Sequence, residues 1–92
     1  FRGIRMDFTA REDDFEVLVE RQKERVKNQI LTSYINLRKE RGITQQEIAD
    51  RTGIKRTNVA RIESGRNAPT IEVLVKLAAA LDMELEIRLV ER

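Results

Sequence analysis

Side chains recur with the spacing of an α-helix over most of the chain. From Glu12 to Arg41 no glycine or proline interrupts the pattern, and a capping box, Thr9-x-x-Glu12, precedes it. Two largely apolar stripes follow one another along this segment: Phe15, Leu18, Val19, Gln22 and Val26, then Ile30, Leu31, Tyr34 and Leu37. We therefore predict two helices that meet near Lys27 and Asn28.

Capping signals divide the middle of the chain into three shorter helices. Glycine ends a helix in the left-handed conformation, and threonine accepts hydrogen bonds from the free N–H groups that begin one. These signals follow one another along the chain: Gly42, Thr44 with Glu47 in a second capping box, Gly53, Gly65 and Thr70. They predict a helix of about two turns before Gly53, a helix over residues 56–64, and a last helix that ends at Leu81.

Both ends of the chain change to an alternation of period two, which is typical of β-strands. Residues 4–8 show it weakly, and the C-terminal segment shows it with four apolar positions: Met83, Leu85, Ile87 and Leu89. An isolated strand leaves its backbone groups unpaired. The C-terminal strand must therefore pair with the same strand of a second subunit, with residues 4–8, or with a partner protein. We favour self-pairing, which makes these four residues a predicted dimer interface.

The residue types that are missing exclude several classes of function. The 92-residue chain is long enough for one domain and has no cysteine or histidine, which excludes disulfides, thiol chemistry, histidine bases and ordinary zinc sites. It also has no glycine-rich phosphate loop, so we expect no enzyme, no catalytic residue, no metal and no cofactor. The lack of a signal peptide and of an apolar run of about 18 residues predicts a soluble cytoplasmic protein with no membrane partner.

Positive charge is concentrated in one short region. The chain has a net charge of +2, but residues 30–70 hold eight basic and four acidic side chains, and the whole excess lies between Arg51 and Arg66. A local basic patch attracts polyanions even when the protein is nearly neutral. A solvated helix surface is the plain alternative, so charge alone does not decide between the two.

The same region has the pattern of two short helices joined by a turn that contains Gly53. Such a helix-turn-helix places its second helix in the major groove of DNA. Val59 and Ile62 supply an apolar face that anchors this helix, and the other face carries side chains suited to base edges: Arg56, Thr57, Asn58 and Arg61. Flanking polar groups suit phosphates instead: Gln45, Gln46, Lys55, Ser64, Arg66 and Asn67.

Residues 30–81 carry a specific pattern, TQQEIA…G…VARIESG…PT, and resemble the helix-turn-helix domain of the XRE/Cro-C1 family of phage and bacterial repressors. The resemblance implies an all-α, lambda-repressor-like bundle of about five helices, here with an N-terminal helical extension and a C-terminal β-strand. It implies that Gln45 binds phosphate, that Arg56, Thr57 and Arg61 read bases, and that Asn58 reads a base or holds a phosphate. Arg38 and Glu63 match the family's structural ion pair. Lys55 departs from the usual Ser or Thr cap, which favours a frayed helix start but suits a nearby phosphate.

The flanking segments are similar to those of HigA-like antitoxins. This resemblance implies an N-terminal extension over residues 1–28, a DNA-binding domain over residues 29–82 and a dimerisation strand over residues 83–92. It further implies a homodimeric repressor that binds a palindromic operator in double-stranded DNA and silences a small basic toxin that cleaves mRNA. Two alternatives remain, namely a stand-alone repressor with no toxin partner and a helical adaptor whose basic helix binds an acidic protein.

Overall fold

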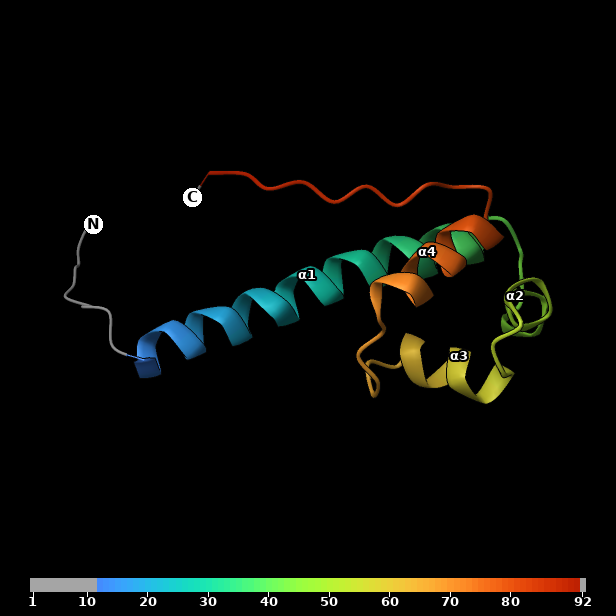
Figure 1. Cartoon of the computed structure of the whole chain (residues 1–92). Coiled ribbons are helices and arrows are strands. Elements are labelled where there is room, and N and C mark those ends of the chain that lie inside the picture. The colour runs from blue at the N-terminus through green and yellow to red at the C-terminus, as the bar shows by residue number, and fades with distance from the viewer. Residues whose placement is uncertain (1–11, 92) are drawn as a thin grey trace. The chain divides into compact units, whose positions relative to one another are not determined.

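The computed structural model describes residues 12–91, and these form four α-helices (Figure 1). The helices are α1 (Glu12–Glu40), α2 (Gln45–Thr52), α3 (Arg56–Glu63) and α4 (Ile71–Ala80). The chain divides into two compact units, Phe1–Ile30 and Leu31–Arg92. The strand signal of residues 4–8 and the Thr9 cap lie outside the described residues. Among the helices that the structure describes, none is long and apolar enough to cross a membrane.

The predicted break near Lys27 and Asn28 is wrong, because α1 is continuous from Glu12 to Glu40. No glycine or proline is present to end the helix there. Two ion pairs at helical spacing lie directly before this point, with Lys23 Nζ 3.0 Å from Glu20 and Lys27 Nζ 3.2 Å from Glu24. The described residues therefore contain four helices rather than about five.

The second unit encloses a small core to which each helix contributes. Its buried members are Leu31, Tyr34, Ile48, Ala49, Val59, Ile62, Leu77 and Leu81. Helix α2 packs against both α3 and α4. Val59 and Ile62 were predicted on the anchoring face of α3, and the structure confirms both; Tyr34, from the second apolar stripe, also lies in this core. The two short helices are thus fixed to the unit by the faces that the sequence pattern predicts.

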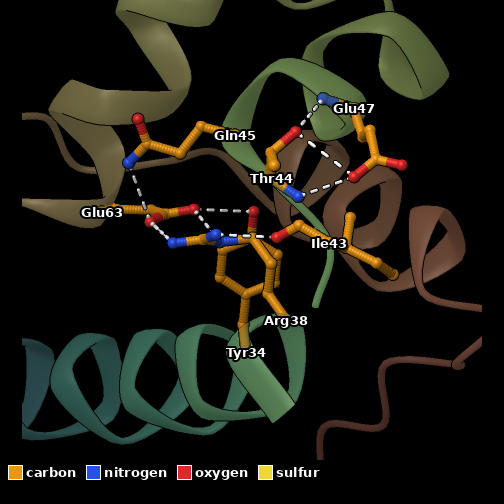
Figure 2. Close-up of polar contacts among 7 residues, drawn as sticks. All are labelled: Tyr34, Arg38, Ile43, Thr44, Gln45, Glu47 and Glu63. Carbon is orange, nitrogen blue, oxygen red and sulfur yellow. Dashed lines mark hydrogen bonds and ion pairs between the residues drawn. The ribbon is translucent and has the colours of Figure 1, made fainter. Parts of the chain in front are cut away.

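Capping residues set the helix ends as predicted. The Thr44 side chain accepts a hydrogen bond from the Glu47 N–H, and the Glu47 carboxylate accepts one from the Thr44 N–H (Figure 2). Gly53 ends α2 at φ 79°, a conformation that costs a residue with a Cβ atom about 1 kcal/mol or more. The Thr70 hydroxyl caps α4 by accepting from the Val73 N–H at 3.1 Å.

The predicted C-terminal strand is absent from the described chain. Residues 83–91 follow α4 without helix or β-ladder, because the rest of the described chain is helical and offers no strand edge to pair with. Ile87 and Leu89 are exposed over 63% and 101% of their surface. The segment begins at a fixed point, because Arg41 Nη1 donates to the Leu81 carbonyl and Arg51 Nη1 donates to the Ala80 carbonyl at 2.7 Å.

A buried ion pair joins the end of α3 to α1. Arg38 donates through Nε and Nη2 to the two carboxylate oxygens of Glu63, at 2.9 and 2.7 Å, and only 9% and 7% of the two side chains are exposed (Figure 2). The remaining guanidinium nitrogen, Nη1, donates to the Ile43 carbonyl at 2.8 Å. This two-bond geometry confirms the structural pair that the resemblance implies.

Two further groups donate to the Glu63 carboxylate, and the sequence pattern predicts neither contact. The Tyr34 hydroxyl donates to Oε2 at 2.9 Å, and Gln45 Nε2 donates to Oε1 at 3.1 Å. Burial and the negative charge of Glu63 raise the pKa of Tyr34 well above its ordinary value. Helices α1 and α2 therefore both hold the last residue of α3.

Glu63→Gln is expected to destabilise the fold by roughly 3–5 kcal/mol, because Arg38 then keeps a buried charge without its counter-ion. Urea unfolding measures this loss. The matched control is Arg38→Met combined with Glu63→Leu, which removes both charges and is expected to lose less than the single change. A single variant as stable as the wild type would contradict the structural role of the pair.

The Tyr34 phenol is expected to keep its proton in the folded chain at pH values where an unfolded tyrosine, with a pKa of about 10, loses it. Above that pH the unfolded state binds fewer protons than the folded state, so stability falls as the pH rises. The chain has one tyrosine, so phenolate absorbance reports on this residue directly. Equal titration midpoints in buffer and in urea would overturn the expectation.

Candidate nucleic-acid interface

A short turn fixes the angle between α2 and α3. It runs from Gly53 to Lys55, and Ile54 at its centre packs against the core. The Thr52 hydroxyl donates to the Ile48 carbonyl at 2.7 Å and accepts from the Ile54 N–H at 3.1 Å. Thr52 therefore ties the turn to α2. Thr52 is not among the residues predicted from the sequence pattern, although a threonine directly before a helix-ending glycine is a local signal for such a bond.

Helix α3 has an inner and an outer face. Val59 and Ile62 are buried, with 0% and 6% of their surface exposed. The four residues predicted to contact bases are all exposed: Arg56, Thr57, Asn58 and Arg61. Because the inner face is held by the core and by the bonds to Glu63, these side chains are presented to solvent together on a fixed helix.

The first turn of α3 lacks a side-chain cap, as the sequence predicts. Lys55 occupies the cap position and its side chain makes no capping hydrogen bond. Its carbonyl accepts from the N–H groups of Asn58 and Val59, at 2.9 and 3.0 Å, so the helix nonetheless begins at Arg56. The positive end of the helix dipole and two adjacent cations meet here, an arrangement that favours an anion.

The structure separates the predicted phosphate contacts into two groups. Lys55 and the loop residues Ser64, Arg66 and Asn67 are exposed around the two ends of α3, although the Ser64 hydroxyl donates to the Arg61 carbonyl at 2.9 Å. Both glutamines of α2 have internal partners. Gln45 is half-buried and donates to Glu63, and exposed Gln46 donates to Asp50 Oδ1 at 2.9 Å.

The surface around α3 is positively charged. The acidic residue of this helix, Glu63, is buried and neutralised by Arg38. Four exposed cations lie on α3, on the turn before it and on the loop after it: Lys55, Arg56, Arg61 and Arg66. Within residues 12–91 none of these four forms an ion pair. Arg51, the fifth cation of the basic region, binds the end of α4 instead. Unpaired cations beside exposed amide and hydroxyl groups can bind phosphates and base edges together.

Several known proteins are similar to this chain in sequence. A regulator of the HTH type from Sinorhizobium fredii is 38% identical over 50 residues, which cover 54% of this chain and 65% of that protein. Another from Methanothermobacter thermautotrophicus is 40% identical over 47 residues, covering 51% of this chain and 68% of that protein. The cryptic phage CTXphi transcriptional repressor RstR of Vibrio cholerae is 43% identical over 51 residues, covering 55% of this chain and 46% of that protein.

Each alignment spans from about half to about two thirds of the relative's own length. No solved structure shows a significant match to the chain. The profile of the helix-turn-helix family HTH_3 matches residues 35–87, from the second half of α1 into the C-terminal segment. With most of its length covered by that match, the chain belongs to the HTH_3 helix-turn-helix family.

Proposed function

We propose that the protein is a sequence-specific repressor that inserts α3 into the major groove of its operator. The observation that carries this proposal is the division of α3 into a buried apolar face and an exposed face with Arg56, Thr57, Asn58 and Arg61. RstR, which is 43% identical to this chain over 51 residues, is named as a repressor. Like such proteins, it would act by occupying DNA that the transcription machinery needs.

Each exposed group has a distinct role in this proposal. Arg56 and Arg61 present planar guanidinium groups that can donate two hydrogen bonds to guanine, while Asn58 can pair with adenine. The Thr57 methyl group suits the methyl of thymine. Lys55 and Arg66 lie at opposite ends of α3 and bind phosphates, which positions the helix without reading sequence. One N–H of the Gln45 amide is used by Glu63, which leaves its second N–H for a phosphate.

A palindromic operator requires two copies of the chain, with recognition helices about 34 Å apart. The C-terminal segment is the first candidate for joining them. Its alternate apolar residues are Met83, Leu85, Ile87 and Leu89, and all but half-buried Leu85 are exposed. A strand partner from a second subunit would satisfy backbone groups that have no ladder within the described chain and would cover these side chains.

A more specific proposal is that this repressor is also an antitoxin, and it rests on the resemblance of the flanking segments to HigA-like proteins. In that role the chain would also bind a small basic toxin encoded beside it. The stand-alone repressor is the alternative, and the match to RstR, a phage repressor, supports it.

Arg56→Ala is expected to cost about 1–3 kcal/mol of operator binding and to relax the base preference at one position. Lys55→Ala is the matched control, because it removes one exposed positive charge at the adjacent residue. It is expected to weaken all DNA sequences evenly and to reduce the salt slope of log K by about 1. Binding to an operator library selected with the wild-type chain measures both. Uniform loss with both variants would contradict base reading by Arg56.

Native mass spectrometry tests the two assembly proposals together. We expect the full chain to be a dimer, and a chain that lacks residues 85–92 to have a higher dimer dissociation constant, because the tail contributes to the interface. Unchanged dimerisation after truncation would refute the tail interface.

Each chain is also co-expressed with the product of the neighbouring open reading frame. A stoichiometric complex supports the antitoxin role, whereas a homodimer without that product leaves the stand-alone repressor.

A further inference from the structure

The first half of α1 exposes an apolar stripe that the DNA-binding unit does not explain. Phe15, Val19 and Val26 are exposed over 66%, 48% and 45% of their surface. Together with Gln22 they occupy positions i, i+4, i+7 and i+11, which lie along one side of a helix. This spacing matches alternating d and a positions of a heptad, so the stripe has the form of a coiled-coil seam.

The same segment has opposite charge in its two halves. Residues 12–20 contain five acidic residues and no basic one, and residues 21–27 contain four basic residues and one acidic one. Ion pairs within the helix use Glu20 with Lys23 and Glu24 with Lys27. Within the described residues Asp14, Glu16, Arg21 and Arg25 have no ion-pair partner. A surface that pairs with this helix must therefore match an acidic half and a basic half.

We propose that this stripe packs antiparallel against the same stripe of a second copy of the chain. Antiparallel pairing places the acidic half of each helix beside the basic half of the other, whereas parallel pairing places like charges together. One register satisfies both the seam and the charges. It sets Phe15 against Val26 of the second copy and Val19 against Gln22 of the second copy.

The charged residues beside the seam also match in this register. With Val19 at position a, Glu16 and Lys23 both fall at position e. In an antiparallel pair the e positions of the two helices face each other, so Glu16 of each copy lies beside Lys23 of the other. The pairing occurs twice by symmetry. A wholly basic partner would match only the first half of the segment, which is why a second copy is the occupant that fits.

The helix supplies its own control for the seam. Val17 is exposed over 47% of its surface, nearly the same as the 48% of Val19. Two residues along a helix correspond to a rotation of about 200°, so Val17 lies on the opposite side of α1 at position f. Surface exposure and helix propensity are therefore matched, and only the seam differs between the two valines.

A charge-swap experiment on the full-length chain tests this interface. Glu16→Lys sets two lysines against each other in the homodimer, and Lys23→Glu sets two glutamates against each other. Each single variant is expected to raise the dimer dissociation constant about tenfold. A mixture of the two restores opposite charges at both positions. Native mass spectrometry, with one variant labelled with ¹⁵N, is expected to show heterodimer well above the half that random exchange gives.

The readout remains decisive if the C-terminal segments also pair. Tail pairing alone exchanges subunits at random, so a heterodimer fraction of one half overturns the proposal. A wild-type chain that is monomeric at all concentrations also overturns it, as does capture of a co-expressed basic partner through this helix with random mixing of the variants.

Val19→Asp is expected to weaken the dimer while Val17→Asp leaves it unchanged. Equal effects of the two substitutions would contradict the seam. The interface does not depend on DNA binding.

Discussion

The geometry of the second unit, Leu31–Arg92, depends on the buried carboxylate of Glu63. Isolated, such a charge would be strongly unfavourable, but Tyr34, Arg38 and Gln45 donate four hydrogen bonds to it. The donors come from α1 and the first residue of α2, and the acceptor is the last residue of α3. Because a charged hydrogen-bond network tolerates little displacement, it fixes both the position of α3 and its rotation about its own axis.

The same network determines the electrostatics of the exposed face. Glu63 is the acidic residue of α3, and its burial against Arg38 leaves the outer surface of the helix to Lys55, Arg56, Arg61 and Arg66. One interaction therefore anchors α3 and neutralises the negative charge at the end of this helix. Arg38 also bonds the Ile43 carbonyl next to the Thr44 cap, which links the start of α2 to the same network.

Apolar side chains are buried in one region of the chain and exposed in two others. The core of the second unit buries apolar side chains from all four helices, whereas the stripe of α1 around Val19 and the segment after α4 remain exposed. Exposed apolar surface with a regular period indicates an interface. The proposed repressor of a palindromic operator would need a twofold axis, and either surface could supply one through contact with its own copy. The charge pattern of α1 is self-complementary, which gives that helix a preferred direction of pairing.

The sequence by itself determined the local features of this protein. Caps, helix-ending glycines and apolar spacing depend on residues a few positions apart, so Thr44, Gly53, Thr70 and the buried faces of α2 and α3 were predictable, as was the exposed face with Arg56. Tertiary structure decided contacts between distant residues. The bonds from Tyr34 and Gln45 to Glu63 span 29 and 18 positions, and the bond from Arg51 to Ala80 spans 29. Periodicity gives no signal for them. It also misplaced a break in α1 and predicted a strand after α4, because a helix continues wherever nothing ends it, and a strand forms only where another backbone pairs with it.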